Sequence, residues 1–136
     1  MSRPPDSAGE LIENKSQLIN DLISGCTPRN EWRIGTEHEK FAFRLSDKKR
    51  LPYEGPDGIG EILSRLTRFG WKPIQEKDKT IALQMNGCAI TLEPGGQFEL
   101  SGAPLETIHQ TCDEVHNHLA QVKEVGAELG LSLIHI

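Results

Sequence analysis

The chain has 136 residues, a formal net charge of −5 and a pI near 5.5. This length fits about one domain with a moderate core, and the acidic balance excludes the basic footprint of a nucleic-acid-binding protein. The three cysteines have no paired metal spacing, and no secretory signal or apolar run of about 18 residues occurs. The sequence therefore predicts a soluble, cytoplasmic protein with no nucleic-acid or membrane partner.

The first elements are a tail, a helix and a strand. Residues 1–8 are polar and proline-bearing, and we expect a disordered tail there. Apolar residues recur at helical spacing over residues 9–24, and Gly25 is a natural stop. Residues 32–45 alternate as a strand does, which predicts the first strand of a sheet.

A second helix is predicted over residues 56–69. Pro56 suits the first helical position and Gly70 suits the end, with apolar residues on one face between them. The extended segment 71–74 follows, and Pro73 favours an edge position for it in the sheet.

Two short apolar runs, 80–85 and 88–92, flank Asn86-Gly87. Asn-Gly in this setting is a strong signal for a β-hairpin. The second run continues into residues 92–101, where two glycines after a proline predict a bend or bulge.

The clearest helical stripe covers residues 104–129, and Ser101 and Pro104 suit its entrance. Residues 131–136 resemble the start of another strand with nothing after it to pair with. The order of elements predicts an α+β fold in which helices pack on a mainly antiparallel sheet.

Carboxylates alternate with other residues in two extended segments, 32–45 and 92–101. Alternate side chains of a strand share a face, so each segment has one polar side. The residues on these polar sides are Glu37, Glu39, Glu93, Gln97, Glu99 and Ser101. If both strands lie in one sheet with these sides together, four carboxylates converge. Each like-charge pair at ~5 Å then costs roughly 3 kcal/mol at an effective dielectric of about 20.

Hard cations relieve such repulsion, and a ligand set of oxygen atoms alone favours Mg²⁺ or Mn²⁺ over zinc. The simpler interpretation of the same alternation is an exposed strand edge whose charges are solvated.

Two longer motifs contain these carboxylates. The first is Trp32-Arg-Ile-Gly-Thr-Glu-His-Glu-Lys-Phe41, and the second runs from Leu92 to Thr107 and continues through His109 to Val115. Together they closely resemble the glutamate–cysteine ligase family of plants and many proteobacteria. That family belongs to the carboxylate–amine ligases, which are related in fold to glutamine synthetase.

The resemblance implies that residues 9–130 are the N-terminal part of a longer catalytic domain with a curved antiparallel sheet. It leaves residues 131–136 as a truncated or artefactual end. Family members use ATP to join the γ-carboxyl of L-glutamate to the amino group of L-cysteine through a γ-glutamyl phosphate, which is the first step of glutathione synthesis. The arginines that bind the substrate carboxylate are expected beyond residue 136, which predicts that this chain alone is inactive.

In the family, inward-facing carboxylates hold Mg²⁺ between the enzyme and the ATP phosphates. Transferred by position, this role falls on Glu37, Glu39, Glu93 and Glu99, and Gln97 becomes a candidate for orienting glutamate or a metal-bound water. Two other functions stay open: a sister γ-glutamyl ligase that uses another amine, and a non-catalytic metal-binding module or remnant.

Several other residues have two interpretations each. Cys112 matches a position that forms a regulatory disulfide in plant members, but its place on the apolar stripe favours a core cysteine. His109, Cys112 and His116 lie at helical steps that imitate a zinc site, and the same stripe argues against it. We interpret residues 48–50 as a solvated loop, and Arg33 as a partner of either a carboxylate or a phosphate.

Overall fold

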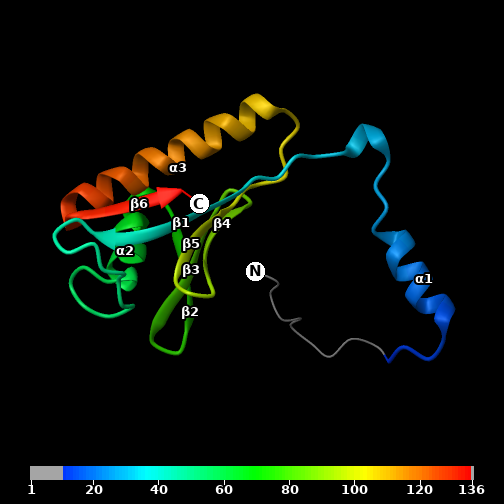
Figure 1. Cartoon of the computed structure of the whole chain (residues 1–136). Helices are drawn as coiled ribbons and strands as arrows, with labels where there is room; N and C mark the ends of the chain where they lie inside the picture. The colour runs from blue at the N-terminus through cyan, green and yellow to red at the C-terminus, as the bar shows by residue number, and fades with distance from the viewer. Residues whose placement is uncertain (1–10, 136) are drawn as a thin grey trace. The chain divides into compact units, whose positions relative to one another are not determined.

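The computed structural model describes residues 11–135, and the chain divides into two compact units, residues 1–32 and 33–136. The tail predicted over residues 1–8 lies outside the described residues. The first unit contains α1 (Lys15–Ser24) and a short 3₁₀ turn, and the second contains the sheet and the other two α-helices (Figure 1).

The helix α1 begins later than the apolar pattern predicts because Asn14 caps it. The Asn14 side chain accepts a hydrogen bond from the Gln17 N–H (3.1 Å), and the Gln17 side chain accepts one from the Asn14 N–H (3.1 Å). This reciprocal capping box fixes the first turn. None of the residues of α1 is buried, so its apolar stripe is not part of a core.

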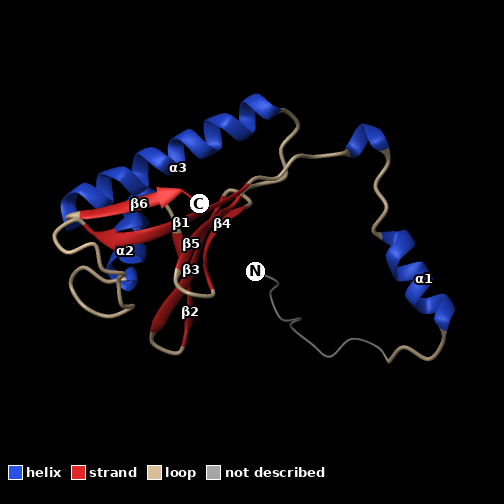
Figure 2. Ribbon diagram, in the orientation of Figure 1, coloured by secondary structure: helices blue, strands red, loops and turns tan. Residues whose placement is uncertain are grey.

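The second unit is a six-stranded sheet with helices, coloured by element type in Figure 2. Its strands are β1 (Glu37–Arg44), β2 (Lys72–Glu76), β3 (Lys79–Met85), β4 (Cys88–Glu93), β5 (Gln97–Ser101) and β6 (Leu131–His135). They lie in the order β2-β3-β4-β5-β1-β6, and every pairing is antiparallel. The predicted α+β class with an antiparallel sheet is confirmed.

The predicted hairpin and edge strand are both confirmed. Asn86 and Gly87 have positive φ values of 50° and 86°, as the favoured two-residue turn requires, and they join β3 to β4. The strand β2, with Pro73 in it, lies at one edge of the sheet. The start of a strand predicted at the end of the chain is found as β6, which pairs backwards with β1 from Arg44 opposite Leu131 to Lys40 opposite His135.

Helix α2 (Ile59–Leu66) continues into a 3₁₀ turn and ends at Gly70, whose φ of 97° is in the left-handed region. Its buried residues are Ile59, Ile62, Leu63 and Leu66. The helix starts after Gly58 rather than at Pro56, because the N–H of Ile59 is taken by the carbonyl of Pro52 (3.0 Å) in the preceding loop.

Helix α3 (Ile108–Leu129) starts four residues later than predicted. Ser101 is still paired in β5, and Leu105 exchanges two backbone hydrogen bonds with Ile34 (2.7 and 2.8 Å), so the chain stays extended there. Thr107 then caps the helix in a capping box with Gln110.

The face of α3 that packs inward is rotated from the predicted stripe. Its buried residues are Thr111, His118, Val122, Val125 and Gly126. Ile108 and Leu119, which belong to the predicted stripe, are exposed. Two polar residues thus take core positions that an apolar pattern cannot reveal.

The core lies between one face of the sheet and the two helices α2 and α3. Ala42 of β1, Ile90 of β4, and Phe98 and Leu100 of β5 belong to it, and Leu131 brings in β6. The alternate residues of these strands point to the other face, which neither α2 nor α3 covers.

Candidate metal-binding face of the sheet

The three strands β4, β5 and β1 place four glutamates on the face away from the helices. Glu39 is directly opposite Glu99 in the β1–β5 pairing, and Glu37 is opposite Ser101. Residues opposed in this way have Cβ atoms about 5 Å apart on one side of the sheet. Glu93 is the cross-strand partner of Gln97 in the β4–β5 pairing, on the same side. We call Glu37, Glu39, Glu93 and Glu99 the carboxylate face.

The route by which Glu93 reaches this face differs from the prediction. Residues 92–101 are two strands joined by a turn rather than one bent strand, and the N–H of Gly96 closes the turn onto the carbonyl of Glu93 (3.0 Å). Gly95 and Gly96 have φ values of 82° and 75°, which other residues rarely adopt. The reversal puts Glu93 beside Gln97, so the alternation is interrupted but the shared face is kept.

Glu99 occupies the middle of this face. It lies on the central strand of the three and is only 4% exposed. The Ser101 hydroxyl donates to its Oε1 (2.9 Å), and the Thr91 hydroxyl donates to its Oε2 (3.3 Å). An ionised carboxylate has about four acceptor sites, so each oxygen keeps capacity for a cation or another donor.

Thr91 was missed by the sequence interpretation. It lies on β4 two residues before Glu93 and directly opposite Glu99. Its position two residues from a carboxylate on the same strand was the available signal, since residues i and i+2 share a face.

The four glutamates share one face of the sheet, but their carboxylates do not converge on a single point. Among residues 11–135, no three acidic, histidine or cysteine side chains gather closely enough to hold a metal ion. This holds for the four glutamates and also for His109, Cys112 and His116. The donors on the carboxylate face are nonetheless all oxygen atoms, from carboxylates, hydroxyls and the Gln97 amide, which is the set that suits Mg²⁺ or Mn²⁺.

Behind the carboxylate face lies a buried cationic residue. Lys40 of β1 is 1% exposed, and its Nζ donates to the carbonyl of His38 (3.1 Å). Burial lowers the Lys40 pKa to about 8. His118 of α3 stacks on Phe98 at a centroid distance of 6.3 Å, and burial together with the nearby charges of Lys40 and His38 lowers its pKa to about 3.

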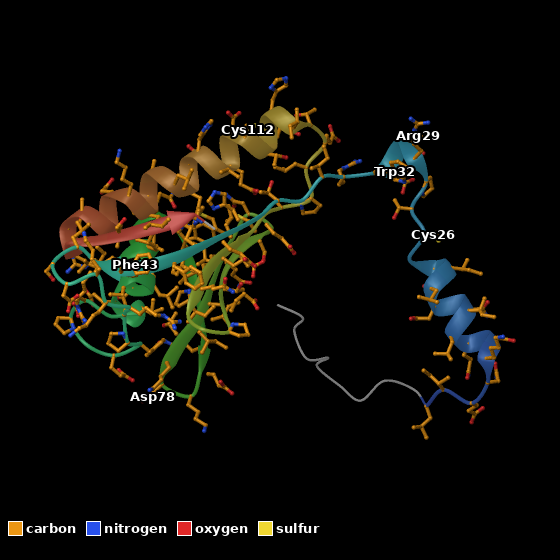
Figure 3. The ribbon with its side chains drawn as sticks, in the orientation of Figure 1. Cys26, Arg29, Trp32, Phe43, Asp78 and Cys112 are labelled. Atoms are coloured by element: carbon orange, nitrogen blue, oxygen red, sulfur yellow. The ribbon has the colours of Figure 1, made fainter. Side chains whose placement is uncertain are left out.

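Arg33 and Cys112 both lie away from the carboxylate face in their contacts or exposure. Arg33 pairs with the Glu106 carboxylate (3.3 Å). Cys112 is on α3 and its side chain is exposed (Figure 3), so the preference for a core cysteine was wrong. The reason is the rotated stripe of α3, which turns Cys112 outward and puts Thr111 inside.

Comparison with known proteins agrees with the two motifs. The model of glutamate–cysteine ligase family 2 matches residues 33–135, which is the unit that contains the sheet. The chain belongs to this family.

Curated ligases of plants are similar over almost the whole chain. Glutamate–cysteine ligase A of Oryza sativa subsp. japonica is 49% identical over 99% of the chain, and the Medicago truncatula enzyme is 51% identical over 99%. The Arabidopsis thaliana enzyme is 50% identical over the same share. The chain spans about a quarter of their length, 26–27%.

The family relatives also correct one expectation. Each of these glutamate–cysteine ligases is named as chloroplastic, so the prediction of a cytoplasmic protein was wrong, and the plastid is the compartment to which the comparison points. As for membranes, no helix within residues 11–135 combines the length and apolar character that crossing a bilayer would need.

Proposed function

We propose that the protein to which this chain belongs is an ATP-dependent glutamate–cysteine ligase that makes γ-glutamylcysteine for glutathione synthesis. The observation that carries the proposal is the opposition of Glu39 and Glu99 on the uncovered face of the sheet, in a member of this family. The Cβ atoms of residues opposed in this way are about 5 Å apart, and a cation between the two carboxylates would relieve their repulsion.

In the proposed reaction, the γ-carboxylate of glutamate attacks the γ-phosphorus of ATP, and ADP leaves. The amino group of cysteine then displaces phosphate from the γ-glutamyl phosphate and loses a proton as the amide bond forms. A divalent cation supplies charge neutralisation and alignment for a reaction between two anions. The cation is Mg²⁺ or Mn²⁺ in this proposal, since the donors are oxygen atoms.

The residues of this chain have distinct parts in the proposal. Glu39 and Glu99 are the central metal ligands, and Glu37 and Glu93 complete the set from either side. Thr91 and Ser101 orient Glu99 through the hydroxyl bonds described above. Gln97 orients the substrate glutamate or a metal-bound water. The remainder of the longer relatives supplies the rest of the pocket, so we expect the chain alone to bind the cation without forming product.

Mn²⁺ binding tests the proposal. The free Mn²⁺ signal in electron paramagnetic resonance is titrated with the chain, with and without ATP. The variants Glu39→Gln and Glu99→Gln are each expected to weaken Mn²⁺ binding at least about tenfold, because each loses a charged ligand. Glu76→Gln, on the exposed edge strand β2, is the matched control and should bind as the wild type does. Equal binding by all four proteins would remove the metal role from this face.

A further inference from the structure

The loop after β1 brings an arginine onto the carboxylate face. The loop is tied to the end of the strand, because the N–H of Arg44 donates to the carbonyl of Lys49 (3.0 Å). Arg50 then forms an antiparallel bridge opposite Phe43. Opposed residues in such a bridge point to the same side, and Phe43 shares the side of Glu37 and Glu39 because it lies an even number of residues away. Figure 3 marks Phe43 on β1.

Two contacts fix where the guanidinium lies on that side. Its Cζ is 6.0 Å from the centroid of the Phe41 ring. Its Nη2 is 3.3 Å from the position that a Cβ on Gly95 would take, so it lies against the turn between β4 and β5. Phe41 is two residues beyond Glu39, or about 7 Å along the strand. Arg50 is therefore at the end of the carboxylate face where Glu93 and Gln97 are paired.

The sheet leaves room for this arrangement. Strand β5 begins at Gln97, and its pairing with β1 ends where Phe98 lies opposite Lys40, so the second half of β1 has no β5 beside it. The returning loop takes that place. Gly95 has no side chain, and a larger residue there would press on the guanidinium.

The charge of Arg50 is not neutralised within the described residues. Arg44, Arg65 and Arg68 each form an ion pair with a carboxylate of the chain. Arg50 forms no ion pair with any carboxylate of residues 11–135, although the carboxylate face is adjacent. The Arg50 side chain is exposed. A guanidinium is always charged, and its planar donor fork matches the oxygen atoms of a phosphate.

We propose that Arg50 binds a phosphate group of the triphosphate whose metal ion the carboxylate face holds. The inference rests on the proposed function. A small divalent cation bound by one or two carboxylates takes further ligands from substrate phosphates, so the phosphates lie over Glu39 and Glu99. The guanidinium of Arg50 lies by Phe41, one strand repeat from Glu39 on the same face, and it then donates to a phosphate oxygen that the cation does not neutralise. The solvated loop predicted from the sequence thus contributes a binding residue.

The test uses the chain with Mn²⁺ and inorganic tripolyphosphate as the probe. Isothermal titration gives the affinity for Mn²⁺ alone and for the Mn²⁺–tripolyphosphate complex. Arg50→Met is expected to leave the affinity for Mn²⁺ alone within about twofold and to weaken binding of the complex roughly ten- to hundredfold, the range for a lost charge-assisted hydrogen bond. Arg50→Lys keeps the positive charge but loses the planar donor fork. Its affinity for the complex should therefore lie between that of the wild type and that of Arg50→Met.

Lys49→Met is the matched control, since it removes the same charge one residue away, where the side chain points elsewhere and approaches Asp47 (3.8 Å). It should bind the complex as the wild type does. An equal loss in Lys49→Met and Arg50→Met would show a general charge effect and overturn the assignment of Arg50. Circular dichroism melts of the three variants establish that each is folded as the wild type is.

Two further arms separate the other outcomes. Titration of L-glutamate in the presence of Mn²⁺ detects a carboxylate ligand instead. If Arg50→Met weakens glutamate binding and leaves tripolyphosphate binding intact, the phosphate assignment is wrong. If the wild type binds Mn²⁺ but Arg50→Met binds the complex with unchanged affinity, the role of Arg50 is refuted while the metal role stands. If the wild type binds no Mn²⁺, both proposals fall together.

Discussion

Replacing the buried lysine of β1 should stabilise the chain. Lys40 is 1% exposed, and burial lowers its pKa from 10.5 to about 8. One pKa unit corresponds to about 1.4 kcal/mol, so the charged form costs the folded state about 3 kcal/mol. The Lys40→Met variant also loses the hydrogen bond to the His38 carbonyl, worth about 1 kcal/mol. We expect a net gain of about 2 kcal/mol in the free energy of unfolding at pH 7.

The same shift gives this gain a specific pH dependence. The pKa of Lys40 is lower in the folded state, so between pH 8 and 10.5 the unfolded chain holds the proton more tightly and wild-type stability rises with pH. The advantage of Lys40→Met should therefore be complete below pH 8 and vanish by pH 10.5.

Urea denaturation of both proteins between pH 7 and 10.5 measures the effect. Lys72→Met, on the exposed edge strand β2, is the control for loss of a lysine charge and should show little change at any pH. A variant that is less stable than the wild type at pH 7, or a gain that does not depend on pH, would refute the reasoning from burial.

Three further perturbations follow from the packing. The pKa of His118 is lowered from 6.5 to about 3, so the folded state loses stability as pH falls through that interval. In urea denaturation, the unfolding free energy of His118→Phe should rise relative to that of the wild type as pH falls from 6.5 to 4. A difference between the two proteins that stays constant with pH would contradict this. Hydrogen bonds from Arg68 and Arg65 lower the Glu128 pKa to about 2, so the contribution of Glu128 to stability is present above pH 4.5 and is lost as pH falls toward 2. Glu128→Gln should remove this pH dependence from a series of thermal melts, and 1 M salt should weaken it in the wild type. A Cβ on Gly58 would lie 2.5 Å from the Tyr53 carbonyl oxygen, so Gly58→Ala should lower the unfolding free energy by about 2–4 kcal/mol. Gly96→Ala should lower it by about 1 kcal/mol, because nothing lies within 4 Å of a Cβ there. Equal losses in the two variants would mean that the close approach at Gly58 is unimportant.

The parts of the fold that depend on local chemistry were predictable. Asn86-Gly87 specifies its turn through positive φ values, and the alternation around Glu37 and Glu39 is a property of the strand itself. The shared face of the glutamates followed from that alternation. Element boundaries were less accessible, because Ser101 could be read equally well as a helix entrance or as a strand residue. Its pairing with Glu37 decides between them, and that partner is distant in the sequence.

The features that the sequence did not reveal are contacts between distant segments. Arg50 reads as part of a charged loop, and only the return of that loop beside β1 brings it to the turn at Gly95. Lys40 is a charged residue that the sequence analysis did not single out, and the parity of β1 puts it in the core with His118. In both cases the environment of the residue is made by elements that no local pattern specifies.

The place of β1 between β5 and β6 has a consequence for how the chain folds. Strands β2 to β5 follow one another as neighbours in the sheet, so they form by short loop closures, whereas β1 must pair with strands that lie much farther along the chain. Long closures are slow, and we expect β1 to dock late. Glu37 and Glu39 therefore meet Glu93 and Glu99 only in that last step, after most of the core has formed. A bound divalent cation would then act mainly by slowing the departure of β1, and so would lengthen the lifetime of the folded chain more than it speeds folding.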